Sequence, residues 1–95
     1  NAHCTAKGLA TVYEELPNLL PAGLLAEALA QVEGTDRLLQ DHAVWTLGWR
    51  RDGGWYGMGG IGGSSAGHDE EKGYTLAYVT RRLGTHDRSD ACWDA

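Results

Sequence analysis

The chain has 95 residues and a formal net charge of −5, and 42% of its residues are hydrophobic. This length allows one domain at most, and the apolar content predicts a packed globule rather than a disordered segment. The negative charge offers no attraction to nucleic acid or anionic lipid, and no apolar run reaches the length of a membrane helix. We therefore expect neither nucleic acid nor a membrane as a partner.

The first third of the chain has helical periodicity. Apolar residues recur every three or four positions over 6–16, and Pro17 is expected to end this helix. A second helix is predicted over 21–32, with Gly34 closing it. Residues 35–42 carry several charges and predict a loop.

From residue 43 onward the apolar period changes to two, which predicts strands. The expected strands are 43–49, 55–58, 64–68 and 74–80. Residues 69–73 predict a hairpin turn, and Thr85 is expected to cap a C-terminal helix. Two helices, three or four antiparallel strands and a last helix predict an α+β fold, in which helices pack on a small antiparallel sheet.

Residues 57–68, GMGGIGGSSAGH, match two short glycine motifs. Residues 57–62 fit G-x-G-x-x-G of dinucleotide sites, and residues 63–67 fit the G-x-S-x-G nucleophile elbow around Ser65. Both motifs need a helix directly after the turn, whereas a strand is predicted here, so neither is favoured. A plainer interpretation is that the glycines permit positive φ angles and close packing of the backbone.

Four segments together resemble one enzyme family over nearly the whole chain. They are NAHCTAKGLA (1–10), WTLGW (45–49), YGMGGIGG (56–63) and DEEKGYTLAYVT (69–80). In this order they resemble the C-terminal part of the serine β-lactamase-like hydrolases, which include class C β-lactamases, penicillin-binding-protein-like peptidases and family VIII esterases. The resemblance implies that residues 1–95 are a single partial domain of a β-lactamase/transpeptidase-like fold. Its partners would be the remainder of a parent chain and a small-molecule acyl substrate, and the start at Asn1 agrees with a longer chain.

The resemblance assigns the glycine segment to the family's third catalytic motif, on a strand at the edge of the active site. Met58, Gly59 and Gly60 would form a wall along which substrate lies, and the N–H of Ile61 would be one of two oxyanion donors. The family usually has Lys, His or Trp where this chain has Met58. A thioether cannot donate a proton or hold a carboxylate, which favours an esterase-like or degenerate site.

The family's nucleophile motif, S-x-x-K, has no match in this sequence. The lysines are Lys7 and Lys72, and neither follows a serine by three residues. We therefore expect no catalytic residue in this chain, which alone would be inactive. The parent would transfer acyl groups from an ester, amide or β-lactam through an acyl-serine intermediate. The alternatives are a non-catalytic interaction or structural module derived from the same fold, and glycine loops unrelated to the family.

Other chemistry-bearing residues have simpler explanations. His68 and Asp69 are neighbours in a strand and point to opposite faces, so they are expected to flank a turn. His86 and Asp87 are expected at the start of the last helix. The tryptophans at 45, 49 and 55 predict sheet packing rather than a ligand cage. The histidines lack metal-ligand spacing and the two cysteines are expected as reduced thiols, so we expect no metal and no cofactor.

Overall fold

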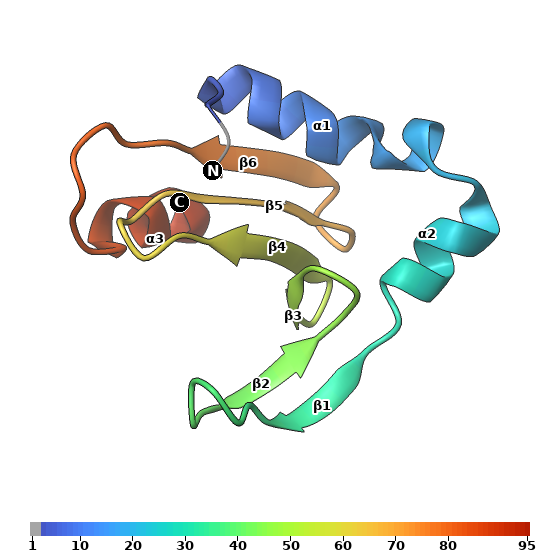
Figure 1. Cartoon of the computed structure of the whole chain (residues 1–95). Helices are drawn as coiled ribbons and strands as arrows, with labels where there is room; N and C mark the ends of the chain where they lie inside the picture. The colour runs from blue at the N-terminus through green and yellow to red at the C-terminus, as the bar shows by residue number, and fades with distance from the viewer. Residues whose placement is uncertain (1–2) are drawn as a thin grey trace.

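The structure is a computed structural model that describes residues 3–95. Its elements are α1 (Ala6–Leu19), α2 (Ala22–Ala28), β1 (Val32–Thr35), β2 (His42–Trp45), β3 (Arg50–Asp52), β4 (Trp55–Gly59), β5 (Ser65–Asp69), β6 (Tyr74–Tyr78) and α3 (Asp87–Asp94). Within the described residues, the strands form one six-stranded antiparallel sheet in which each pairs with the next along the chain (Figure 1). The predicted α+β class is confirmed, although the sheet has more strands than expected.

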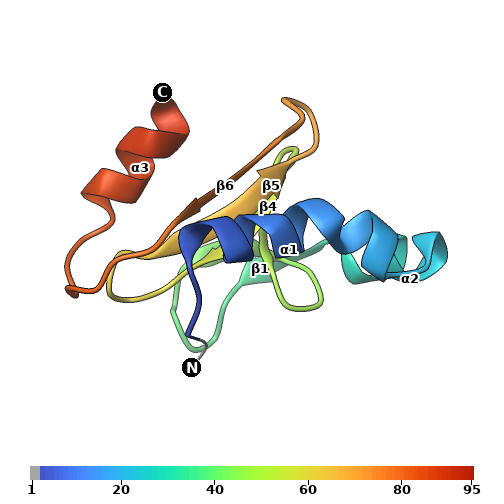
Figure 2. The ribbon, with the colours of Figure 1, turned by 90° about the horizontal axis from the view of Figure 1, so that it is seen from above.

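The two faces of the sheet carry different helices. Figure 2 shows α1 on one side of β4–β6 and α3 on the other. The β4 side chains alternate accordingly, so that Tyr56 faces α1 and Trp55 faces α3. The ring of Tyr56, which is 2% exposed, lies 6.3 Å from that of Tyr13 and 5.8 Å from that of Trp49. The small core is therefore centred on Tyr56, beneath α1.

Helix α1 is longer than predicted, because Pro17 does not end it. The Thr5 hydroxyl caps its first turn by accepting a hydrogen bond from the backbone N–H of Gly8 at 3.0 Å. Beyond Pro17 the helix continues to Leu19, and the N–H of Leu20 bonds to the carbonyl of Leu16 at 3.0 Å. Leu16 is buried and Leu20 packs against the core, so apolar burial outweighs the single bond that proline cannot make.

The second helix is shorter than the predicted range 21–32. It ends at Ala28, and Gly34 lies inside β1 rather than behind a helix. Strand β1 is exposed along its length, so its sequence lacks the alternation that identifies a strand; pairing with β2 holds it extended. The predicted loop shrinks to residues 36–41, where the Asp36 carboxylate accepts two backbone N–H bonds at 2.8 Å.

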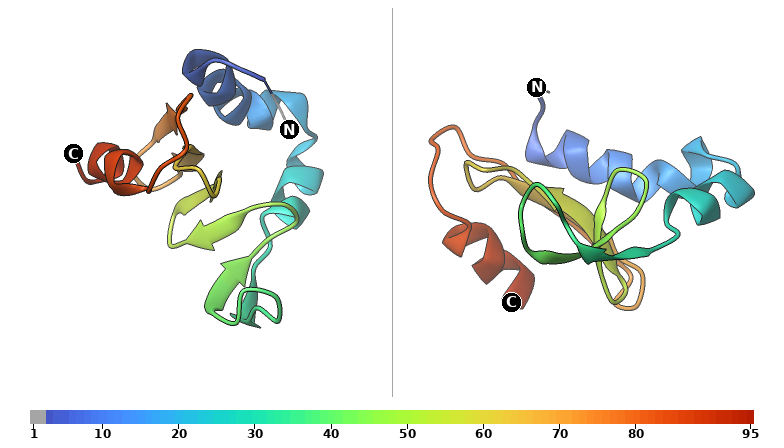
Figure 3. Two further views of the ribbon diagram at one scale, coloured as in Figure 1. Left: turned by 60° about the vertical axis from the view of Figure 1, so that its left-hand side comes forward. Right: turned by 60° about the horizontal axis from the view of Figure 1, so that its bottom comes forward.

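The strand predicted over 43–49 is broken by a tight turn. Gly48 has a φ of 105°, which favours glycine, and the N–H of Thr46 bonds to the carbonyl of Trp49 at 2.9 Å. The chain then returns as β3. Figure 3 shows how β1 and β2 swing away from the plane of β4–β6. The predicted strands β4, β5 and β6, and the turn between the last two, are confirmed within one or two residues.

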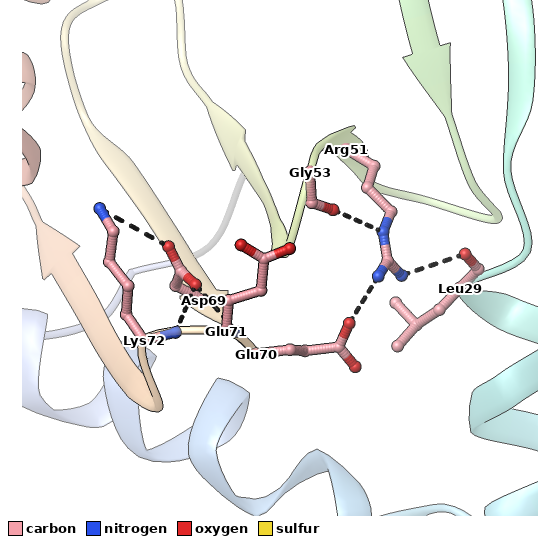
Figure 4. A network of polar contacts seen from close by, with 7 residues as sticks. All are labelled: Leu29, Arg51, Gly53, Asp69, Glu70, Glu71 and Lys72. Atoms are coloured by element: carbon pink, nitrogen blue, oxygen red, sulfur yellow. Dashed lines mark hydrogen bonds and ion pairs between the residues drawn. The ribbon is translucent and has the colours of Figure 1, made fainter.

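Arg51 links β3 to two neighbouring segments, as Figure 4 shows. Its Nε donates to the carbonyl of Gly53 at 3.2 Å, and its Nη1 donates to the carbonyl of Leu29 at 3.4 Å. Its Nη2 forms an ion pair with Glu70 in the β5–β6 turn. One guanidinium thus joins the end of α2 to two β turns.

Candidate functional site

Residues 58–61 of the glycine segment lie at the surface, where β4 ends and turns back into β5. The N–H of Gly60 bonds to the carbonyl of Ser64 at 2.7 Å, and the N–H of Gly63 bonds to the carbonyl of Gly60 at 3.0 Å. Met58 is 41% exposed and Ile61 is fully exposed. The predicted wall, Met58 to Ile61, is therefore an open strand end.

Several glycines of the segment are required by the fold itself. A Cβ on Gly57 would lie 2.3 Å from the carbonyl oxygen of Ala66, and one on Gly67 would lie 2.6 Å from that of Tyr56. Gly63 has a φ of 96°, and a Cβ there would lie 2.3 Å from the carbonyl oxygen of Thr85. Close backbone packing explains these glycines without a ligand.

Gly59 and Gly60 are not required in the same way. Neither has a positive φ. The nearest atom to a Cβ on Gly60 would be the carbonyl oxygen of Ser64, at 3.8 Å, an ordinary contact distance. A Cβ on Gly59 would meet only the edge of the His86 imidazole, at 3.0 Å. Gly60 therefore leaves room for a group from outside to approach the backbone, whereas the His86 ring covers Gly59.

The backbone N–H of Ile61 has no hydrogen-bond partner among residues 3–95. It directly follows Gly60, where a Cβ would meet only an ordinary contact, and it belongs to a fully exposed residue. This amide can therefore donate to an atom from outside the described chain. The resemblance predicted an oxyanion donor at this position.

A groove of about 700 Å³ runs beside the strand end, on the α3 face of the sheet. Its walls include Met58, Gly59, Ser65 and His86. The Nδ1 of His86 lies 3.2 Å from the hydroxyl of Ser89, so this imidazole is held against α3 while its edge covers Gly59. His86 therefore joins the site from the far end of the chain, which no local sequence pattern could predict.

The start of α3 differs from the prediction. His86, not Thr85, occupies the N-cap position, and its side chain makes no capping hydrogen bond. The Thr85 hydroxyl instead donates to the carboxylate of Asp87 at 2.8 Å. The His86 imidazole instead contacts the Ser89 hydroxyl in the first turn of α3 and lies beside Gly59.

The two glycine motifs disfavoured by the sequence are also disfavoured by the geometry. No helix follows residues 57–62, and Ser65 lies within β5 rather than on a strand-to-helix turn. The Ser65 hydroxyl is buried and accepts a hydrogen bond from Nε1 of Trp93 at 3.2 Å. It is packed beneath α3 and is not presented as a nucleophile.

The remaining polar and aromatic residues make contacts within the fold. The Asp69 carboxylate accepts the turn amides of Glu71 and Lys72 at 3.0 and 2.9 Å, while His68 Nδ1 lies 2.8 Å from the Thr75 hydroxyl. Trp55 lies across the neighbouring glycines and packs edge-to-face on Trp93. Over the described part of the chain, no three His, Cys, Asp or Glu side chains are grouped as metal ligands, and both cysteines are free.

Comparisons with models of protein families, with curated proteins and with solved structures gave no significant match to this chain. No helix in residues 3–95 is long and apolar enough to cross a membrane.

Proposed function

We propose that this chain forms the C-terminal wall of the active site of a β-lactamase-like serine hydrolase. The remainder of the parent chain would supply the serine nucleophile and its lysine base, which the 95 residues lack. The reaction would be acyl transfer from an ester, amide or β-lactam through an acyl-serine intermediate.

The observation that carries the proposal is the pairing of Gly60 with the Ile61 amide. A Cβ at Gly60 would lie at an ordinary contact distance, 3.8 Å, from the Ser64 carbonyl oxygen, so internal packing does not require the glycine. The next N–H along the chain has no partner within the described residues. An unobstructed backbone beside an unused donor is suited to a substrate carbonyl that approaches from outside.

Each wall residue then has a defined role. Gly59 and Gly60 let the substrate lie against the strand, and the Ile61 N–H donates to the oxyanion of the tetrahedral intermediate. Such a donor lowers the barrier by about 3 kcal/mol when it is well placed. Met58 provides no proton and no cation, so the group next to it would be uncharged.

The test uses the natural gene product, captured by an antibody against residues 74–95, and a fluorophosphonate probe. We expect a serine outside residues 1–95 to be labelled, and the isolated 95-residue chain to remain unlabelled. Gly60→Val in the natural product should slow labelling at least tenfold, because it obstructs the approach to a donor of this strength. Gly34→Val is the matched control, since a Cβ at Gly34 meets no atom within 4 Å and lies on distant β1. Labelling of the isolated chain, or equal slowing by both variants, would contradict the proposal.

A non-catalytic interaction or structural module derived from the same fold is the second candidate. Met58 favours it, because the residue leaves the motif without the polar side chain usual in the family. The exposed Met58 and Ile61 would then contact a protein partner rather than a substrate. A natural product that takes up no probe and has no S-x-x-K motif would support this candidate.

A further inference from the structure

His86 brings a polar atom to a part of the candidate wall that has almost none of its own. The side chains of Met58, Gly59 and Gly60 offer only a thioether, which is a weak acceptor. The three atoms nearest to a Cβ on Gly59 would all belong to the His86 ring, with Nε2 at 3.6 Å. His86, Met58 and Gly59 also line the same groove. The imidazole therefore lies where a side chain of the wall itself would point.

Ser89 determines which nitrogen of this imidazole carries the proton. Ser89 is 0% exposed, and its hydroxyl donates its single proton to the carbonyl oxygen of His86 at 2.9 Å. The Nδ1 of His86 lies 3.2 Å from the same hydroxyl oxygen, so Nδ1 must supply the proton of that second hydrogen bond. In the neutral ring the lone pair is then on Nε2. Within residues 3–95 this nitrogen has no hydrogen-bond partner, so it can accept one from outside.

The Nε2 of His86 and the backbone N–H of Ile61 form a complementary pair at the strand end. One accepts a hydrogen bond and the other donates one. Gly59, beneath the ring, and Ile61 are at most about 7 Å apart along the chain. A molecule whose carbonyl oxygen accepts from Ile61 can therefore present a hydroxyl or N–H, a few bonds away, to Nε2.

We propose that His86 is a specificity-determining residue of this site, an inference that rests on the proposed function. Its Nε2 accepts a hydrogen bond from a hydroxyl or amide N–H of the substrate, close to the scissile carbonyl. The charged side chains of the same groove are Arg50, Asp52 and Asp90, so carboxylate acceptors outnumber the donor there as well. A substrate without that proton would set an acceptor against Nε2 and leave both unpaired, which slows its reaction.

The experiment compares the nitrophenyl esters of lactic acid and of its O-methyl ether, which differ in one donated proton, as substrates of the natural gene product. The ratio of kcat/KM, hydroxy ester over methoxy ester, should fall about fivefold in His86→Asn. The Asn amide can still donate to Ser89 but does not extend to the position of Nε2. His86→Gln, whose side chain is longer, should restore part of the ratio. His42→Asn is the matched control, since His42 lies on β2 and is exposed, and should leave the ratio unchanged.

Nitrogen NMR of the imidazoles in the 95-residue chain tests the orientation of His86 without any activity. At about pH 8.5, at which an ordinary imidazole is neutral, the proton should be found on Nδ1. Ser89→Ala should abolish this preference, because it removes the acceptor. A proton on Nε2 in the unsubstituted chain would overturn the inference.

The results separate this inference from the proposed function. If the natural product hydrolyses both esters but His86→Asn leaves the ratio unchanged, or His42→Asn lowers it equally, the proposed function stands and this inference is wrong. If the natural product hydrolyses neither ester and takes up no fluorophosphonate, the proposed function is contradicted, and the role of His86 with it.

Discussion

At the scale of single residues, the glycines of the 57–68 segment fall into two kinds that the sequence does not distinguish. Gly57 and Gly67 have backbone atoms of the neighbouring strand where a side chain would begin, and Gly63 has a positive φ. Gly60 has neither constraint. The glycines of one short segment thus include positions that packing requires and a position that is open at the surface.

This distinction predicts that the same substitution, glycine to alanine, has a large effect on stability at one position and a small effect at the other. Gly57→Ala should lower the free energy of unfolding by about 2 kcal/mol or more, because the new Cβ would lie 2.3 Å from the Ala66 carbonyl and separate β4 from β5. Gly60→Ala should change it by no more than about 0.5 kcal/mol. Urea unfolding of both variants checks this, and a similar loss in both would show that Gly60 is also needed by the fold.

The two buried tyrosines predict a dependence of stability on alkaline pH. Burial raises the pKa of Tyr13 and of Tyr56 above the usual 10.0. Below pH 10 both states keep the tyrosines protonated, so their contribution to stability is fully present. Above it the unfolded chain loses its phenol protons first, and stability falls as pH rises toward the raised values.

The measurement is urea unfolding at neutral pH and at about pH 11, with Tyr13→Phe beside the wild type. The variant should lose less stability between the two conditions than the wild type does. An identical loss would show that other groups cause the alkaline destabilisation.

At the scale of elements, sequence patterns correctly predicted those helices, turns and strands that interactions between nearby residues determine. The α1 periodicity, the Asp69 turn and the two tyrosines of β6 all lie in the elements expected of them. The predictions were wrong for the end of α2, for strand β1 and for the turn at Gly48, because pairing between strands determines these features. The candidate site follows the same rule: Met58 to Ile61 are contiguous in the sequence, whereas His86 reaches β4 only through the packing of α3.

Arg51 provides a test of how the elements are joined. Arg51→Lys should lower the free energy of unfolding by about 1 to 2 kcal/mol, because an ammonium group cannot replace the fork that reaches Leu29, Gly53 and Glu70 together. Arg50→Lys is the matched control, since Arg50 is exposed and makes no ion pair within residues 3–95. Chemical denaturation of both variants measures the difference, and equal stability of the two would contradict the linking role.

At the scale of the whole molecule, many large apolar side chains remain in contact with water. The most exposed are Val32, Leu38, Leu47, Ile61 and Leu83. The edge of β1 is unpaired within the described chain. A surface of this kind is typical of a domain that packs against a further segment or a partner.

The isolated chain should therefore associate with itself. We expect sedimentation velocity to give a mass that rises with protein concentration, and the double variant Leu38→Lys/Ile61→Lys to reduce that rise, because it removes two of the most exposed apolar side chains. A monomer at every concentration, with a sharp cooperative thermal transition, would indicate that the 95 residues form a complete surface.

The central claim is that these residues are one wall of a larger hydrolase, and the intact mass of the natural gene product tests it most directly. The product is captured from source cells with an antibody against residues 74–95 and weighed by mass spectrometry. The account predicts a product several times heavier than 10.2 kDa, with S-x-x-K in the added sequence. A product at the mass of the 95 residues alone would contradict it, and the open strand end at Gly60 would then belong to a chain without a nucleophile.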